Sequence, residues 1–208
     1  MKKAIAIVCS AVILSSTVFG QSFNTVLDWM FSEGLTRYDQ VADFRPNDFI
    51  TRGEAAKFVN QYAQLEWLTK NYTQCNFWDI AGYDYTLVPH IAEACAYGLL
   101  KGSNGTFNPN GNITEAQAIT VVIRSLYGFL DETGQYRRQP YYEAGKQLGI
   151  IQSETLQGTN QVNITRQKLG TWFYIASQQI TNQDIAGLDG SEDLLNILED
   201  IFGSEVLN

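Results

Sequence analysis

One local pattern occurs three times in the chain, and this repetition constrains the fold more than any other feature. Each copy has an isoleucine followed by a threonine that can cap a helix, namely Thr51, Thr114 and Thr165. Each threonine follows, by 17, 16 and 16 residues, a glycine that can end an earlier helix. A unit of helix, glycine stop, loop and capped helix therefore recurs. Units this small bury little surface alone, so we expect the copies to pack together.

The residues after each threonine refine this prediction. Thr51 and Glu54 have the spacing of a capping box, in which each side chain accepts from the backbone N–H of the other residue. Thr114 and Gln117 have the same spacing, whereas in the third copy Lys168 replaces the acid or amide. The sequence therefore predicts two complete capping boxes and one incomplete one.

The pattern and the composition divide the chain into five segments. They are a signal peptide at 1–20, repeats at 21–65, 73–128 and 135–180, and an acidic C-terminal helix and tail at 181–208.

Residues 1–20 have the features of a secretory signal. Lys2 and Lys3 precede an uncharged, mostly apolar run over 4–14, and Val18 and Gly20 are small enough for a cleavage site after Gly20. The apolar run is shorter than the roughly 20 residues that a membrane span requires, although an uncleaved anchor is the alternative. We expect export, cleavage and no membrane span afterwards.

Net charge limits the partners. Cleavage removes two lysines and no acid, so the formal charge changes from −8 to −10. Such a chain is not expected to bind nucleic acid through its overall field. Any anion that it binds must meet a local cluster of cations.

Cys75 and Cys95 are the two cysteines that remain after cleavage. An even number in an exported chain predicts a disulfide, and their spacing does not resemble a zinc site. The alternative is a buried free thiol at Cys95 and an unrelated Cys75.

Catalysis is not expected. His90 is the one histidine and follows Pro89 at a predicted helix start, where a structural role is expected. A single histidine argues against histidine-dependent triads and histidine-rich metal sites, and no glycine-rich phosphate loop is present. A carboxylate pair of a glycoside hydrolase stays open as an alternative. We expect no metal and no cofactor.

Two stretches resemble the S-layer homology (SLH) motif. The first is Phe-Arg-Pro-Asn-Asp at 44–48 with Ile-Thr-Arg-Gly-Glu-Ala at 50–55, where the family has Ile-Thr-Arg-Ala-Glu and Gly53 is the one change. The second is Gly-Leu-Leu-Lys-Gly at 98–102, Gly-Thr-Phe-Asn-Pro-Asn at 105–110 and Ile-Thr at 113–114, opened by Phe-Trp-Asp-Ile at 77–80. The third copy lacks both that opening and the Phe-x-Pro loop. The resemblance covers about residues 24–178.

The resemblance implies a mainly α fold of three SLH-like helix-loop-helix repeats packed as a pseudo-threefold prism. It implies an exported, non-catalytic cell-surface protein that binds an anionic cell-wall polysaccharide, often pyruvylated, non-covalently in grooves between repeats. By position in the motif, the ligand-binding candidates are Thr51, Arg52, Thr165 and Arg166. Glu115 stands where repeat two should have its arginine, which predicts an inactive groove there.

For both arginines the alternative is a solvated surface cation. A cation in the first turn of a helix gains nothing from the helix dipole, so Arg52→Ala is expected to leave stability nearly unchanged. The resemblance further implies that Glu115→Arg, which restores the family's arginine in repeat two, adds affinity for an anion.

The C-terminal segment 191–202 has an amphipathic helical pattern. Its simplest interpretation is a helix docked on the repeats. The alternative is a helix that binds a protein partner or a second copy, so that the chain is a repeat scaffold for protein–protein interaction or self-assembly at the cell surface.

Overall fold

The computed structural model describes residues 22–62, 70–72, 74–130, 132, 137–151 and 162–185. Within these ranges the chain is mainly helical, as predicted, and isolated β-bridges are its extended pairings. The predicted signal peptide 1–20 and the predicted helix 191–202 lie outside the described residues. None of the described helices is both long and apolar enough to cross a membrane.

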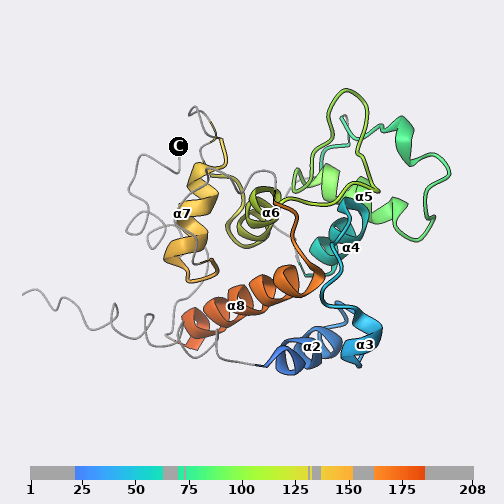
Figure 1. Cartoon of the computed structure of the whole chain (residues 1–208). Helices are drawn as coiled ribbons and strands as arrows, with labels where there is room; N and C mark the ends of the chain where they lie inside the picture. The colour runs from blue at the N-terminus through green and yellow to red at the C-terminus, as the bar shows by residue number, and fades with distance from the viewer. Residues whose placement is uncertain are drawn as a thin grey trace, which may run out of the picture.

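The described helices follow the three repeats in order (Figure 1). They are α2 (Phe23–Ser32), α3 (Val41–Phe44) and α4 (Arg52–Tyr62) in repeat one, the 3-10 turn Trp78–Ile80, α5 (Val88–Ala96) and α6 (Glu115–Tyr127) in repeat two, and α7 (Gln139–Gln147) and α8 (Arg166–Ile185) in repeat three. The sequence did not predict the short α3, and α8 continues beyond the predicted end of repeat three at residue 180.

Both predicted capping boxes are present, at the starts of α4 and α6. At α6, the Thr114 hydroxyl accepts from the Gln117 N–H at 3.4 Å, and the Gln117 side-chain oxygen accepts from the Thr114 N–H at 3.2 Å. At α4, the Thr51 hydroxyl accepts from the Glu54 N–H at 3.2 Å, and the Glu54 carboxylate accepts from the Thr51 N–H at 3.0 Å. Both boxes satisfy backbone donors that a helix start otherwise leaves unpaired.

Thr51→Ala is expected to destabilise the protein by about 1 kcal/mol, the typical cost of a lost N-cap, and Thr165→Ala is expected to cost less. Thr165 accepts from the Lys168 N–H at 3.2 Å, but a lysine cannot return the second hydrogen bond. The Thr51 hydroxyl also lies 3.2 Å from the Glu54 carboxylate, a contact that alanine loses. Midpoints of urea unfolding measure the difference, and the reverse ranking would contradict this capping assignment.

In each repeat, one glycine ends the first helix. Gly34, Gly98 and Gly149 follow α2, α5 and α7, and their φ angles are 70°, 72° and 67°. This left-handed conformation is strained for residues with a Cβ atom, so glycine is the residue that stops a helix in this way. The fixed spacing between glycine and threonine in the sequence therefore corresponds to a real structural unit.

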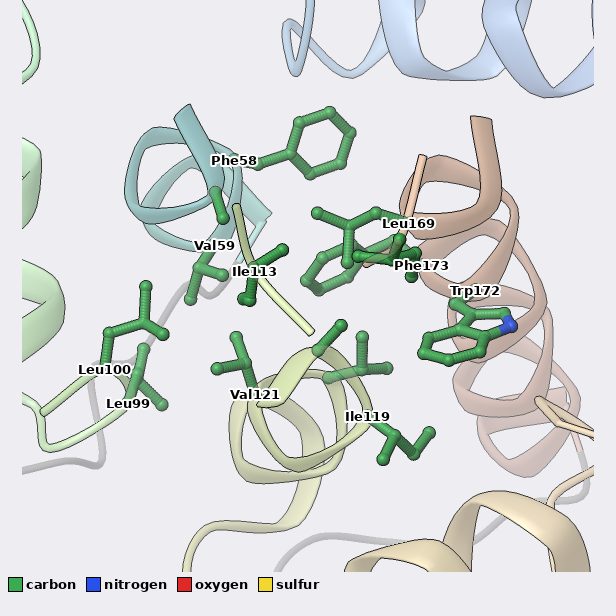
Figure 2. Packing of buried hydrophobic residues seen from close by; sticks show 14 of the residues in the cluster. Phe58, Val59, Leu99, Leu100, Ile113, Ile119, Val121, Leu169, Trp172 and Phe173 are labelled. Carbon is green, nitrogen blue, oxygen red and sulfur yellow. The ribbon is translucent and has the colours of Figure 1, made fainter. Parts of the chain in front are cut away.

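Helix packing links the repeats to one another. The first helix of each repeat packs on the second helix of another repeat: α5 on α4, α7 on α6, and α2 on α8. The second helices α4, α6 and α8 meet at the centre, where apolar side chains from all three form one core (Figure 2). Phe58 of α4 and Phe173 of α8, for example, have ring centroids 5.4 Å apart. A repeat alone would leave most of this apolar surface exposed.

A closed ring of backbone hydrogen bonds joins the three residues that precede the capping threonines. The Ile50 N–H donates to the Ile164 carbonyl at 3.2 Å, Ile164 donates to Ile113 at 3.1 Å, and Ile113 donates to Ile50 at 3.0 Å. Their side chains are 3% exposed or less. The recurrent isoleucine is therefore buried where the three repeats meet, with its backbone groups paired.

A disulfide joins Cys75 to Cys95, as predicted, and ties the first residues of repeat two to α5. It closes a loop of 20 residues. By the chain-entropy model such a bond stabilises the folded state by roughly 3 kcal/mol.

Candidate functional site

The residue after each capping threonine lies at a junction between repeats. Its backbone N–H donates to a carbonyl of a different repeat: Arg52 to Gly111 at 2.8 Å, Glu115 to Val162 at 2.8 Å, and Arg166 to Asp48 at 2.9 Å. The three side chains therefore start from equivalent places, and their differences determine the chemistry of the grooves beside them.

Arg52 is buried, with 8% of its surface exposed. Its Nε donates to the Phe107 carbonyl at 2.8 Å, Nη2 to the Lys101 carbonyl at 3.0 Å, and Nη1 to Gln117 Oε1 at 3.4 Å. The guanidinium also lies over the Phe107 ring, 4.7 Å from its centroid. Arg52 therefore joins α4 to the loop and helix of repeat two, and the alternative of a solvated surface cation is wrong for it.

Arg166 repeats this arrangement one junction further on. Its Nε donates to the Phe44 carbonyl at 2.9 Å, and the guanidinium lies 5.0 Å from the centroid of the Phe44 ring. Nη1 donates to Glu54 Oε1 at 2.8 Å, which forms an ion pair. The Arg166 side chain is 14% exposed, so it too is not a solvated surface cation.

The third junction has the same contact with its charges exchanged. Lys168 Nζ lies 2.5 Å from Glu115 Oε1, and the Glu115 side chain is 8% exposed. Glu115 stands at the arginine position and Lys168 at the capping-box position. The two departures from the motif are therefore the two halves of one ion pair, and Glu115 is already neutralised within the protein.

Arg52 differs from these two junctions because its partners are all neutral. Among the described residues, no carboxylate lies within ion-pair distance of Arg52. Burial lowers the pKa of its guanidinium, and the nearby charge of Arg138 adds to this effect while Asp79 opposes it. The Asp79 carboxylate is already engaged, because it accepts from the N–H groups of Phe107 at 2.8 Å and Asn108 at 2.6 Å.

A groove of about 190 Å³, here called the Arg52 groove, opens beside this guanidinium. The described charged residues that line it are Arg52, Lys101, Arg124, Glu132, Arg137 and Arg138. Among these residues, five cations and one carboxylate face a small space in a chain of strongly negative net charge. This is the local cationic cluster that an acidic protein needs in order to bind an anion.

Glu132, the carboxylate among the described residues of this groove, forms its ion pair with Arg124 and not with the other cations. Arg124 Nη2 forms an ion pair with Glu132, while Nη1 donates to the Gly98 carbonyl at 3.1 Å. The Tyr141 hydroxyl donates to Glu132 Oε1 at 2.6 Å. Burial raises the pKa of Glu132, but these hydrogen bonds from Tyr141 and Arg124 outweigh it, so the net shift is downward and the carboxylate stays charged.

A second groove, of about 220 Å³ and here called the Arg166 groove, is lined mainly by repeat one, together with residues 84, 86 and 87 of repeat two and Arg166 of repeat three. The described charged residues that line it are Arg37, Glu54, Lys57, Asp84 and Arg166. Among these residues three cations face two carboxylates, so their charges are nearly balanced. The two grooves therefore share a backbone geometry but differ in electrostatics.

The predicted site residues divide into two groups. Arg52 and Arg166 line the two grooves, whereas Thr51 and Thr165 cap helices and do not line either groove. The sequence missed the cations at 101, 124, 137 and 138, because they come from a loop, a helix and a connector with no common motif. The adjacent pair at 137–138 in a polar connector was the one available signal.

Gly53, the single change in the first motif, also has a structural cause. A Cβ atom at this position would lie 2.6 Å from the Tyr83 hydroxyl oxygen. Tyr83 follows the 3-10 turn of repeat two and packs against the start of α4. A Tyr83 side chain in this place therefore favours glycine at position 53.

Comparison with known families agrees with the geometry. The family model of the S-layer homology domain matches residues 41–56 and 76–119, which include Arg52, Lys101 and Gln117. No curated protein matches the chain. SLH domains are non-catalytic, generally bind cell-wall polymers, and are typical of proteins at the cell surface. The matched motifs agree with the helical repeats and the arginine junctions, and they identify an S-layer homology domain within this chain over residues 41–56 and 76–119.

Proposed function

We propose that this is an exported, non-catalytic cell-surface protein that binds an anionic cell-wall polysaccharide non-covalently, with the Arg52 groove as the main site. The observation that carries the proposal is the buried Arg52 guanidinium, which has no carboxylate partner in the part of the chain that the structure describes. Leaving a buried charge uncompensated is costly, so an external anion that reaches it gains more than it would from an exposed arginine. Arg137, Arg138 and Lys101 line the same groove and add to the attraction.

The same proposal includes the arrangement of the repeats as a pseudo-threefold prism. It is supported by the ring of hydrogen bonds through Ile50, Ile113 and Ile164, and by the pairing of α2 with α8. In this arrangement each groove lies between neighbouring repeats, and the third one is closed to anions by the pair of Glu115 and Lys168. A polysaccharide then binds to grooves of different chemistry on one molecule.

Sedimentation with purified cell walls tests this function. The mature protein is expected to pellet with the walls saturably, and to be released by salt because exposed cations contribute to binding. Walls from which the acidic polysaccharide has been extracted should no longer retain it. Failure to bind intact walls would overturn the proposal and favour a repeat scaffold for protein–protein interaction.

Lys101→Gln combined with Arg137→Gln is expected to weaken wall binding about tenfold, which corresponds to about 1.4 kcal/mol. Both side chains are exposed residues of the Arg52 groove, so the fold should be retained. Lys146→Gln is the control, because Lys146 is an exposed cation of α7 outside both grooves. It removes one charge where the double variant removes two, so a control that loses half as much binding free energy as the double variant would show that binding depends on net charge and that the groove is not the site.

A further inference from the structure

We infer that Gln117 determines which groove binds a charged sugar. Its neutral amide does not neutralise the charge of Arg52, whereas the Glu54 carboxylate neutralises the equivalent Arg166 in the Arg166 groove. The inference rests on the proposed function, since it concerns the ligand of the same site. It adds that the Arg52 groove binds a sugar carboxylate and that the Arg166 groove does not.

The two junctions place these side chains in the same way. Arg52 Nη1 donates to Gln117 Oε1 at 3.4 Å, and Arg166 Nη1 donates to Glu54 Oε1 at 2.8 Å. Gln117 and Glu54 each also complete a capping box, so their positions are fixed by the start of α6 and the start of α4. The difference between the junctions is therefore an amide against a carboxylate, that is, one unit of charge.

Hydrogen-bonding capacity does not distinguish the grooves, but charge does. A guanidinium has five N–H groups, and Arg52 uses three of them for the protein, so two remain. Arg166 has N–H groups to spare as well, but its charge is neutralised by Glu54. Two opposite unit charges attract each other several times more strongly near a protein surface than in bulk water, because the effective dielectric constant is lower there. A sugar carboxylate gains this attraction at Arg52, whereas at Arg166 the Glu54 carboxylate repels it.

The remaining charges of each groove act in the same direction. In the Arg52 groove the carboxylate of Glu132 is held by Arg124 and Tyr141, which leaves Lys101, Arg137 and Arg138 to face a ligand. In the Arg166 groove Asp84 adds a second carboxylate, which partly offsets Arg37 and Lys57. Substitution at 54 or 117 therefore changes the charge of one groove and leaves the other as it is.

Reciprocal substitutions test the inference. Gln117→Glu places a carboxylate next to Arg52, and Glu54→Gln removes the carboxylate that pairs with Arg166. Glutamate and glutamine both serve in a capping box, so both helix starts should be retained. The probes are methyl glucuronide and methyl glucoside, which differ by the carboxylate, and the readout is a backbone amide NMR titration of the mature protein.

For the wild type, the glucuronide is expected to shift amides near residues 100–101, and the glucoside is expected to have a far smaller effect. Gln117→Glu should weaken the glucuronide at least tenfold. Glu54→Gln should add a second set of shifted amides near residues 36–38, in the Arg166 groove. Melting curves of both variants verify that each is folded, and if Glu54→Gln fails to fold, Gln117→Glu alone decides.

Three results would overturn the inference: no response of the wild type to the glucuronide, equal affinity of Gln117→Glu and wild type, or a folded Glu54→Gln variant without the new shifts. None of these concerns wall retention. A wild type that responds to the glucuronide but is not retained by walls would instead overturn the proposed function. The two failures are therefore distinguishable.

Discussion

Arg52→Ala is expected to lower the free energy of unfolding by about 3 kcal/mol, the size typical of breaking a buried polar network. The substitution removes three hydrogen bonds and the contact with the Phe107 ring, and it leaves the buried Phe107 carbonyl and the Lys101 carbonyl without this donor. Relief of the buried charge offsets part of this loss. The expectation from sequence alone, of nearly unchanged stability, treated Arg52 as a surface side chain and is corrected by its burial.

Equilibrium unfolding in urea measures this effect, and Arg37→Ala is the control. Arg37 is an exposed arginine whose described hydrogen bond goes to the neighbouring Tyr38, at 3.0 Å. Its removal should change stability by less than about 0.5 kcal/mol. An Arg52 variant as stable as the Arg37 variant would mean that the junction contributes nothing to the fold.

Glu115→Arg is expected to destabilise the protein by about 2–3 kcal/mol, near the lower end of the cost of removing one partner of a buried ion pair. The new guanidinium would face Lys168, whose ammonium now lies 2.5 Å from the Glu115 carboxylate. Lys168 is 45% exposed and can turn towards solvent, which keeps the cost below the upper end. Restoring the family's arginine here therefore should not add affinity, contrary to the expectation from the motif alone.

The double variant Glu115→Arg with Lys168→Glu should recover to within about 1 kcal/mol of wild type, because it reproduces the pairing of Arg166 with Glu54. Lys168→Glu alone should be destabilising, since it places two carboxylates together. A double-mutant cycle from urea unfolding is therefore expected to give a coupling energy of at least about 2 kcal/mol. Additive single effects would show that Glu115 and Lys168 do not form the contact described.

Several features of the fold could be predicted from the sequence because they depend on neighbours a few residues apart. The capping boxes at Thr51 and Thr114 need a partner three residues on, and the stops at Gly34 and Gly98 need one residue with a positive φ angle. Such local signals recur with the repeat, so the number and order of the capped helices followed from them.

The burial and the partners of the arginines could not be predicted in this way. The acceptors of Arg52 lie 49, 55 and 65 residues away along the chain, and the partner of Glu115 lies 53 residues away. When each motif is considered alone, Glu115, Lys168 and Gly53 are three separate departures from the family pattern. In the folded chain the first two are one ion pair, and Gly53 makes room for Tyr83.

The sequence by itself therefore determined the helical repeats, their starts and their stops, because backbone conformation and capping depend on a few adjacent residues. Only the tertiary structure decided which charges remain without a partner of opposite charge, because each groove is formed by residues from different repeats. The charge of a groove is the sum of the charges of all these residues. Arg52 and Arg166 occupy the same place in the motif, but Gln117 faces one and Glu54 the other. Each arginine and its partner belong to different repeats, so this difference of one carboxylate cannot be seen in any single motif.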